Sequence, residues 1–286
     1  MKYGVVIFPT AEAIPIGHLA RAAEERGLES LFVCEHSHIP ASRRTPWPLG
    51  SEALPREYWA MIDPLVGLAV AAGATRKILL GTAICLVIQR DPIMLAKETA
   101  TLDVLSGGRF VFGIGAGWNA EEMENHGTPF AQRWEIAREK TEAIKTIWSE
   151  NDAAYHGRWV NFDPIWSEPK PVQKPHPPVL FGGQGLKAMR AAIGYCDGWL
   201  PAVTPDFTEV VDKFRHTAEA AGRDPMALQI TGIWAAVKEG WGLPDGAVVE
   251  RARRSGAQRL ICGVPPLGTE AALRWLDGYT RLIERS

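Results

Sequence analysis

Short apolar runs alternate with amphipathic stretches along almost the whole chain. The apolar runs predict eight β-strands, at residues 3–8, 30–34, 78–83, 109–114, 179–181, 198–201, 228–235 and 259–262. The stretches between them show the helical period, with apolar residues on one face. Apolar strands that alternate with helices are typical of a parallel sheet covered by helices. Eight such units predict an α/β fold, a single (β/α)8 TIM barrel. The alternative is an open doubly wound sheet.

Local signals predict where several helices begin, end and face the core. Asp91 and Pro92 predict a helix start, because aspartate caps free backbone N–H groups and proline fits the first helical position. Gly27 and Gly222 predict helix ends. The predicted apolar faces comprise Phe207, Val210, Val211, Phe214, Ala218 and Ala221 in one helix, Ala137, Ile144, Ile147 and Trp148 in a second, and Leu186, Met189, Arg190 and Ile193 in a third.

Two insertions interrupt the alternation, one at 40–58 after the second strand and one at 151–178 before the fifth strand. Long loops in compact domains are often lids or binding loops. The tryptophans in or beside them, Trp47, Trp59, Trp159 and Trp166, argue against simple disorder. We therefore expect these segments to supply apolar or aromatic walls for a small-molecule substrate.

Composition excludes several classes of function. The formal net charge of −2 over 286 residues provides no field suited to nucleic acid or to an anionic membrane surface. The longest apolar stretch, 64–74, is too short to span a membrane. The four cysteines are widely spaced without a C-x-x-C pair, and the histidines are scattered, so no metal site is predicted. We expect reduced, buried thiols and a cytoplasmic location.

The segment 102–118, LDVLSGGRFVFGIGAGW, is the most distinctive part of the chain. It predicts a helix end, a turn at Gly107 and Gly108, a strand, and a glycine-rich strand exit. Bare backbone at such an exit lets a flat ligand approach closely. The glycines Gly113, Gly115 and Gly117 do not form the dinucleotide fingerprint, because the third glycine of G-x-G-x-x-G is missing.

This segment belongs to a longer block that resembles the bacterial-luciferase-like monooxygenase superfamily, in its coenzyme F420-dependent (deazaflavin) oxidoreductase branch. The similar residues are LLGTAICLVIQRDPIMLAKETATLDVLSGGRFVFGIGAGWNAEEM at 79–123, Gly127, Phe130 and Arg133, FVCEHSHIP at 32–40, DPL at 63–65, and PPVLFGGQGLKAMRAAIGYCDGW at 177–199. The resemblance is weakest after about residue 203. It implies one luciferase-like (β/α)8 barrel domain over 1–286, coenzyme F420 as cofactor, and a homodimer formed through helices of the early strand units.

The second strand ends at Glu35 and His36, a carboxylate next to an imidazole that can transfer a proton. From the residues alone, a salt-bridged surface pair is the alternative. The resemblance implies that an acid followed by histidine here lies against the cofactor ring, so both are predicted catalytic residues. Aspartate is common at the first position in the branch, and the extra methylene of Glu35 moves its carboxylate by roughly 1.5 Å.

The resemblance also implies the cofactor-binding residues at three strand ends. After the third strand, a non-proline cis peptide that backs the ring falls on Ala83 and Ile84. After the fourth, the glycines contact the ring or its chain. After the fifth, glycines before a helix start can bind a phosphate. The residues at the fourth and fifth ends are Gly115, Ala116, Gly117 and Trp118, and Gly182, Gly183, Gln184 and Gly185. Glu121 and Glu122 are interpreted as first-turn carboxylates that favour the helix dipole.

The resemblance thus implies hydride transfer between coenzyme F420 and a small organic substrate. Arg43 and Arg44 lie on a loop suited to the acidic tail of that cofactor. One alternative is a monooxygenase that uses reduced FMN. A second is a non-catalytic flavin-binding protein.

Overall fold

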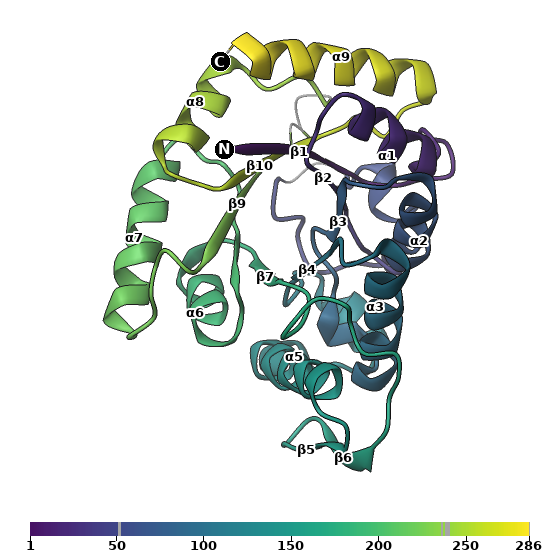
Figure 1. The fold of residues 1–286 in the computed structure, drawn as a ribbon, viewed down its shortest axis with the longest axis vertical. Coiled ribbons are helices and arrows are strands. Elements are labelled where there is room, and N and C mark those ends of the chain that lie inside the picture. The colour runs from purple at the N-terminus through teal and green to yellow at the C-terminus, as the bar shows by residue number, and fades with distance from the viewer. Residues whose placement is uncertain (51–52, 236, 238–240, 286) are drawn as a thin grey trace.

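Eight parallel strands close into a barrel that helices surround (Figure 1). The computed structural model describes residues 1–50, 53–235, 237 and 241–285. The strand order around the barrel is β1-β10-β9-β8-β7-β4-β3-β2, and every neighbouring pair is parallel. The barrel strands are β1 (Lys2–Ile7), β2 (Ser30–Val33), β3 (Leu79–Thr82), β4 (Phe110–Ile114), β7 (Val179–Gly182), β8 (Gly198–Leu200), β9 (Gln229–Trp234) and β10 (Arg259–Gly263).

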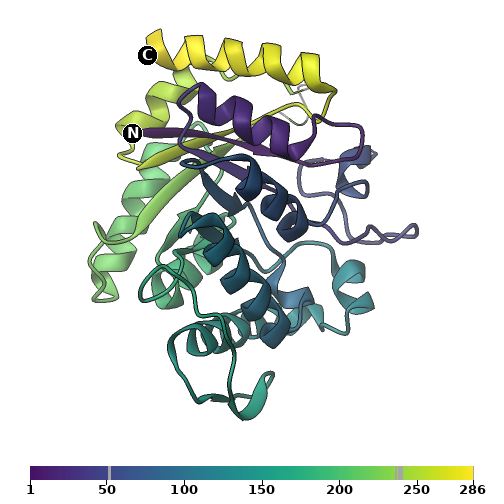
Figure 2. The same ribbon diagram turned by 45° about the vertical axis from the view of Figure 1, so that its right-hand side comes forward.

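The helices lie outside the strands in both views (Figures 1 and 2). They are α1 (Ile16–Glu25), α2 (Pro64–Ala74), α3 (Pro92–Ser106), α4 (Ala120–Asn125), α5 (Arg133–Ser149), α6 (Gly185–Tyr195), α7 (Phe207–Ala220), α8 (Gly246–Arg254) and α9 (Thr269–Arg285). Short 3-10 turns are η1 (Arg56–Tyr58), η2 (Val87–Gln89) and η3 (Phe130–Gln132). Among the described residues, no helix combines the length and apolar character that crossing a membrane requires.

The barrel prediction is confirmed, because each of the eight predicted strands forms within one residue of its predicted ends. The predicted start of α3 is also confirmed. Asp91 accepts a hydrogen bond from the backbone N–H of Met94 at 2.9 Å, and Pro92 is the first helical residue. Gly27 and Gly222 follow α1 and α7 with φ of 73°, which glycine adopts without steric cost.

Two predictions about helix faces are wrong. Ala221 is exposed because α7 ends one residue before it. On α6, Leu186 and Arg190 are exposed, while Met189 and Ile193 are buried as predicted. The buried face of α6 is instead completed by Ala188, Ala191 and Ala192. Because alanines carry short side chains, this face can lie close against β7 and β8 while the longer side chains turn outward.

Two hydrophobic layers hold the barrel together. The larger lies between the strands and the helices and includes Phe112, Trp148 and Phe214. The smaller fills the inside of the barrel with Val6, Phe32, Val111, Leu180, Leu200 and Ile261, each from a different strand. The barrel is therefore a packed core that supports whatever lies at the carboxyl ends of its strands. The four cysteines are buried and free, as predicted.

Both predicted insertions are present. The one before β7 contains an antiparallel hairpin, β5 (Ala153–His156) with β6 (Asn161–Ile165), which the sequence did not predict. Figure 1 shows this hairpin beside α5, far from β1 and β2. The insertion after β2 folds over the barrel instead, where Trp47, Leu54 and Tyr58 form a buried cluster that packs against Trp118. Residues 51 and 52 of this insertion lie outside the described part of the chain.

Asp63 links the start of α2 to the loop after β3. Its Oδ1 accepts hydrogen bonds from the backbone N–H groups of Leu65 and Val66, and its Oδ2 lies 2.6 Å from Nη2 of Arg90. Burial acts to raise the pKa of Asp63, but the hydrogen bonds from Val66 and Arg90 outweigh it and the pKa is lowered. The ionised carboxylate therefore stabilises the folded state.

We expect acid to remove this stabilisation. A carboxyl group whose folded pKa is lowered contributes stability above its unfolded pKa of about 3.9 and loses it as the pH falls through the folded value. Thermal unfolding of the wild type and Asp63→Asn should therefore differ most near neutral pH, with the wild type more stable. The difference in Tm should shrink as the pH falls from about 5 towards 3. A difference that stays constant with pH would contradict this account.

Candidate functional site

Two adjoining cavities open at the carboxyl ends of the barrel strands. The larger has a volume of about 470 Å³. It is lined by Pro48, Ala83, Ile84, Gly115, Ala116, Gly117, Trp118, Trp134, Gly182, Gly183, Gln184, Leu200, Ala202 and Ile233. The smaller, of about 190 Å³, is lined by Phe8, Cys34, Glu35, His36, Tyr58, Ala83, Ile84, Leu86, Gly117 and Trp118. We call them the strand-end cavity and the His36 cavity.

The structure brings the predicted site residues together. All predicted cofactor residues except Gly185 line the strand-end cavity, and both predicted catalytic residues line the His36 cavity. Gly185 is the first residue of α6, immediately beyond this lining. The two cavities share Ala83, Ile84, Gly117 and Trp118, so a ligand in one lies next to a ligand in the other.

Ile84 occupies the centre of this arrangement. The Ala83–Ile84 peptide bond is cis, as the resemblance implied. A Cβ at Gly115 would lie 2.5 Å from Cδ1 of Ile84, and a Cβ at Gly182 would lie 2.3 Å from its Cγ2. Both distances are below 3.0 Å, so a Cβ at either position would force the Ile84 side chain to shift. These glycines therefore make room for the Ile84 side chain, which is a different reason from the close ligand approach that the sequence suggested.

His36 is held between Glu122 and Trp118. Its Nδ1 lies 2.7 Å from Oε2 of Glu122, and the indole N–H of Trp118 donates to its Nε2 at 3.3 Å. An indole nitrogen can only donate, so Nε2 is the acceptor and Nδ1 carries the ring proton. The side chains of His36 and Glu122 are 8% and 1% exposed. The dyad thus places an unprotonated Nε2 at the wall of the His36 cavity.

Glu122 has both oxygens engaged, because its Oε1 accepts the backbone N–H of Ser37 at 3.1 Å. It lies in the first turn of α4, whose cap is the side chain of Asn119. The sequence interpreted Glu122 as a dipole-favouring carboxylate and missed this partnership. No local signal could have shown it, since His36 and Glu122 are 86 residues apart.

Glu35 lines the His36 cavity but its carboxylate is committed elsewhere. Oε2 accepts the backbone N–H of Leu86 at 2.6 Å, and Oε1 lies 2.7 Å from Nε and 2.6 Å from Nη2 of Arg90. Arg90 also pairs with Asp63 at 2.6 Å and with Glu98 at 3.5 Å. This network fixes the loop that follows the Ala83–Ile84 bond.

Lys140 supports the same loop from α5. Its Nζ donates to the carbonyl oxygens of Ile88 and Arg90, at 3.0 and 2.7 Å. Burial lowers the pKa of Lys140 to about 8. Glu35 and Lys140 therefore bind the loop from Cys85 to Arg90 from two sides. These contacts fix the position of the cavity residues that precede the loop.

The start of α6 borders the opposite end of the strand-end cavity. Gly183 and Gly185 have φ of 124° and 81°, values that favour glycine. The side chain of Gln184 donates to the carbonyl of Ala202 at 3.0 Å. Trp134 of α5 lines the cavity, and its indole N–H is buried without a partner. Helix-start N–H groups and an unpaired indole donor suit a ligand with acceptor atoms.

Several lining residues were missed by the sequence analysis, which considered only four strand ends. Leu200, Ala202 and Ile233 come from the ends of β8 and β9, and extending the same reasoning to later strands would have found them. Pro48 and Tyr58 belong to the insertion after β2, which was predicted to supply walls without naming them. Trp134 comes from a helix and carried no signal.

Arg43 and Arg44 lie on the insertion after β2, beside the site. The Arg43 guanidinium lies 5.7 Å from the centre of the Trp118 ring. Arg44 pairs with Glu121 and Glu124, each at 3.2 Å. The Arg44 side chain is 75% exposed and that of Glu124 is 52% exposed, whereas that of Glu121 is only 9% exposed. The exposed Arg44–Glu124 pair contributes little energy, so Arg44 can exchange this partner for another anion.

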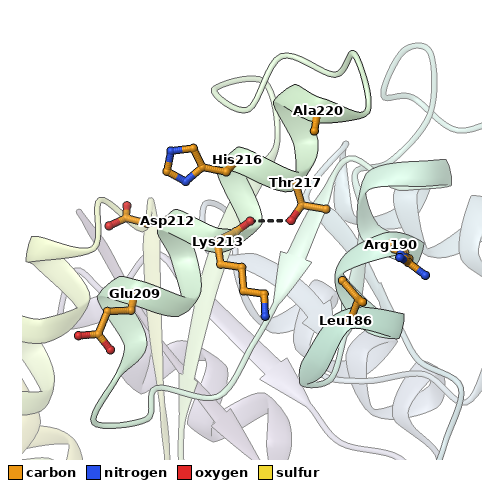
Figure 3. Close-up of a pocket in the computed structure, with 8 residues that line it drawn as sticks. All are labelled: Leu186, Arg190, Glu209, Asp212, Lys213, His216, Thr217 and Ala220. Atoms are coloured by element: carbon orange, nitrogen blue, oxygen red, sulfur yellow. Dashed lines mark hydrogen bonds between the residues drawn. The ribbon is translucent and has the colours of Figure 1, made fainter.

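A larger hollow, of about 710 Å³, lies away from the strand ends between α6 and α7 (Figure 3). Its walls are exposed side chains of both charges, including Arg190, Glu209, Asp212 and Lys213. None of the predicted site residues lines it. A shallow surface groove with solvated charges does not match the concave, mostly apolar form of a small-molecule site. In the described part of the chain, no cluster of three metal-ligating side chains occurs.

Comparison with known proteins identifies relatives that cover from three quarters to nearly all of the chain. Residues 1–237 match the family described as luciferase-like monooxygenase. A Mycobacterium tuberculosis protein described as uncharacterized is 42% identical over 283 residues, which cover 97% of this chain and 96% of that protein. The phthiodiolone/phenolphthiodiolone dimycocerosates ketoreductase of Mycobacterium kansasii is 29% identical over 231 residues, which cover 74% of this chain and 61% of the ketoreductase.

Solved structures show the same fold. A monooxygenase from Streptomyces bottropensis superposes with a TM-score of 0.81 at 22% identity, covering 100% of this chain and 99% of that one. An F420-dependent secondary alcohol dehydrogenase, in complex with an F420–acetone adduct, superposes with a TM-score of 0.76 at 18% identity, covering 99% of both chains. At these identities the similarity shows the fold alone.

Proposed function

The chain belongs to the luciferase-like monooxygenase family, and on that premise we propose that it binds coenzyme F420 and transfers a hydride to or from a small organic substrate. The observation that supports this best is the pair of adjoining cavities, with the His36–Glu122 dyad at the wall of the smaller one. A cofactor in the strand-end cavity would lie beside a substrate in the His36 cavity, within reach of a base.

The strand-end cavity suits a large ring system with a phosphate. Its volume of about 470 Å³ lies within the usual range of ligand sites. We assign the ring to the walls formed by Ala83, Ile84 and the strand-4 glycines, and the phosphate to the start of α6. The unpaired indole N–H of Trp134 is a donor that a bound ligand would satisfy. When bound, the deazaflavin supplies the hydride chemistry.

The protein's own task is to move the accompanying proton. A substrate hydroxyl would take the place of the Trp118 indole N–H on His36 Nε2. Nε2 then accepts the hydroxyl proton when the substrate is oxidised, and the charged imidazole returns it when a carbonyl is reduced. Glu122 stabilises the charged ring through Nδ1. The geometry favours a positioning role for Glu35, because both its oxygens hold the loop from Leu86 to Arg90. We therefore propose His36 as the catalytic residue and Glu35 as a positioning residue.

The relatives support a carbonyl or alcohol substrate. One relative is a ketoreductase, and one structural neighbour is a secondary alcohol dehydrogenase that uses F420. The alternative of an FMN-dependent monooxygenase is supported by two other structural neighbours, the monooxygenase from Streptomyces bottropensis and a riboflavin lyase whose structure contains a modified FMN. A non-catalytic flavin-binding protein would need neither the His36–Glu122 dyad nor the second cavity.

Equilibrium binding of F420 and of FMN to the purified protein tests the proposal. We expect F420 to bind at least tenfold more tightly than FMN, with an affinity that falls as salt is raised, because its acidic tail binds cations. Titrations followed by intrinsic fluorescence at two salt concentrations measure the two affinities and their dependence on salt. Tight FMN binding with weak F420 binding would establish the oxygen-dependent alternative, and binding of neither would overturn both enzymatic hypotheses.

A variant in which Arg43→Ala and Arg44→Ala are combined extends this test. We expect it to weaken F420 binding and to leave FMN binding unchanged, because FMN lacks the acidic tail. Arg158→Ala is the matched control, since Arg158 is an exposed arginine on the β5–β6 hairpin side of the molecule. Unchanged F420 affinity in the double variant would remove the assignment of the tail to this loop.

We also propose that the protein is a homodimer that associates through α2. This helix, PLVGLAVAAGA, carries no charged residue. Val66 and Val70 are 66% and 55% exposed on it, and their spacing of four residues puts them on one face of the helix. Ile62, which precedes the helix, is 37% exposed. Figures 1 and 2 show α2 on the outside of the barrel, between α1 and α3. An apolar row of this kind on a surface helix marks an interaction site.

Val70→Asp should convert the dimer to a monomer with the fold intact, because a charge in an apolar interface is costly to desolvate. Sedimentation analysis measures the mass, and circular dichroism checks the fold. Leu105→Asp is the control, because it places the same charge at an exposed leucine near the end of α3, outside the proposed interface. It should leave the dimer intact. A wild-type protein that sediments as a monomer at micromolar concentration would contradict the proposal.

A further inference from the structure

The His36 cavity contains a second polar group whose role is unassigned. Its volume of about 190 Å³ would hold about six water molecules at ~30 Å³ each, so it suits a compact ligand. Most of its walls are apolar, from Phe8, Ile84, Leu86 and Trp118. Because the walls are mostly apolar, the few polar side chains determine where a ligand must carry hydrogen-bond donors and acceptors.

The charges in the cavity wall are already neutralised. Glu35 is the one carboxylate among the lining residues, and Arg90 and the Leu86 N–H occupy both its oxygens. No lysine or arginine is among them. Burial raises the pKa of the Cys34 thiol, which therefore stays protonated. A cavity of this kind penalises a charged ligand and suits a neutral one.

Tyr58 presents its hydroxyl group to this cavity as an unused donor. The indole of Trp47, whose ring centre lies 5.8 Å from that of Tyr58, acts on the phenol as a hydrogen-bond donor and lowers the pKa of Tyr58 against the larger effect of burial. The phenol proton has no acceptor among the hydrogen bonds of the described residues, although the side chain is buried. A hydroxyl group can donate its proton as well as accept, and Tyr58 Oη is not among the fully enclosed side-chain atoms that lack a partner. The hydroxyl group therefore has open space beside it, and a ligand in the cavity that Tyr58 lines can supply the acceptor.

The phenol is held rigidly beside His36. Its ring centre lies 5.5 Å from that of His36, 5.0 Å from that of Phe8 and 5.8 Å from that of Trp47. Burial raises the pKa of Tyr58 to about 12, so the group keeps its proton at neutral pH. His36 Nε2, which accepts the Trp118 indole N–H in this structure, and the Tyr58 hydroxyl thus form a pair of one acceptor and one donor at the wall of one small apolar cavity. A ligand hydroxyl that binds to Nε2 would take the place of the Trp118 N–H.

We propose that Tyr58 donates a hydrogen bond to the oxygen of a small, uncharged ketone, aldehyde or secondary alcohol in this cavity, and thereby fixes that oxygen next to His36 Nε2. Tyr58 transfers no proton, because His36 performs that task. The inference deepens the proposed function and rests on it for the reaction, but the recognition of a carbonyl oxygen can be tested without turnover.

The test compares two probes of similar shape, cyclohexanone and methylenecyclohexane, which differ in the acceptor oxygen. Their dissociation constants are measured by ligand-observed NMR with the purified full-length protein, with and without F420. For each protein, the dissociation constant of methylenecyclohexane is divided by that of cyclohexanone. The hydration of the free probes is the same for both proteins, so it cancels when the wild type is compared with Tyr58→Phe. We expect the ratio to be about fivefold higher in the wild type, the effect of one hydrogen bond.

Infrared spectroscopy provides a direct second readout. The carbonyl stretch of bound cyclohexanone should lie at lower frequency in the wild type than in Tyr58→Phe, because a donated hydrogen bond weakens the C=O bond. Tyr155→Phe is the matched control, since the Tyr155 hydroxyl donates to Glu142 outside the cavity. Trp47→Phe keeps the Tyr58 hydroxyl while removing its donor, and should give an intermediate frequency.

Equal ratios and equal stretching frequencies in the wild type and Tyr58→Phe would overturn the proposal, as would failure of cyclohexanone to bind. The F420 titration on the same preparations separates this outcome from the proposed function. If F420 binds tightly while Tyr58→Phe has no effect, the inference about Tyr58 fails and the cofactor assignment stands. If F420 fails to bind, the proposed function fails whatever the probes do.

Discussion

Glu122→Gln is expected to lower kcat by about 10²- to 10⁴-fold, the usual contribution of general acid–base catalysis, with little change in F420 affinity. In the wild type the Glu122 carboxylate accepts the Nδ1 proton of His36 at 2.7 Å. A glutamine amide can instead donate to Nδ1, which moves the ring proton to Nε2 and removes the base from the cavity wall. The variant loses the contact between the Glu122 carboxylate and His36, which becomes stronger when the imidazole is charged.

Two measurements distinguish this effect from simple damage. Nitrogen-15 NMR of the histidine rings reports which nitrogen of His36 is protonated, and we expect protonated Nδ1 in the wild type and a shift towards Nε2 in Glu122→Gln. This readout requires neither cofactor nor substrate. Turnover is then measured with the alcohol or ketone that the F420 screen identifies.

Glu124→Gln is the matched control, because Glu124 is on the same helix but its side chain is 52% exposed and contacts Arg44 instead of His36. It should change neither the His36 signals nor kcat. An unaltered tautomer together with unaltered turnover in Glu122→Gln would mean that the dyad has no part in the reaction.

Glu35→Gln should destabilise the protein by about 2 kcal/mol, below the 3–5 kcal/mol typical of a broken buried pair. The Glu35 side chain is 4% exposed and pairs with Arg90 at 2.6 Å. Removing its charge leaves a mostly buried guanidinium with Asp63 and Glu98 as remaining partners, and these reduce the loss. Because the loop that follows Ile84 rests on this pair, F420 affinity should fall in parallel with stability.

Urea unfolding and F420 titration measure the two effects in one preparation. Glu98→Gln is the comparison, since Glu98 faces the same arginine at the longer distance of 3.5 Å and burial raises its pKa. We expect a much smaller loss of stability there. If Glu35→Gln kept full stability and F420 affinity but lost turnover, Glu35 would be a catalytic residue, as the sequence analysis predicted, and the positioning role would be wrong.

The architecture was predictable because its signals are local. Each strand is a short apolar run that must be covered on both sides, and several helices carry their own cap or stop, as at Asp91 and Gly27. The eightfold alternation leaves few ways to bury such strands. Predictions failed where packing between elements decides, as on α6, where the alanine face and not the face of Leu186 and Arg190 turns inward.

The location of the candidate site was also predictable. Side chains at the carboxyl ends of parallel strands meet at one end of a barrel, so Glu35, His36, Ile84 and Gly115 had to lie near one another once the barrel was inferred. The structural roles of individual residues at the site were harder to predict from the sequence. Gly115 and Gly182 looked like ligand-contact glycines, but the atom that excludes a side chain there belongs to Ile84.

The sequence by itself determined the alternation of elements, and through it the barrel and the edge at which the chemistry lies, because these depend on residues close together in the chain. Only the tertiary structure decided which groups act as partners. It joined His36 to Glu122 across 86 residues and Glu35 to Arg90 across 55, and it brought Tyr58 beside His36. Such pairings depend on side-chain direction and burial after folding, which no periodicity or motif in the chain encodes.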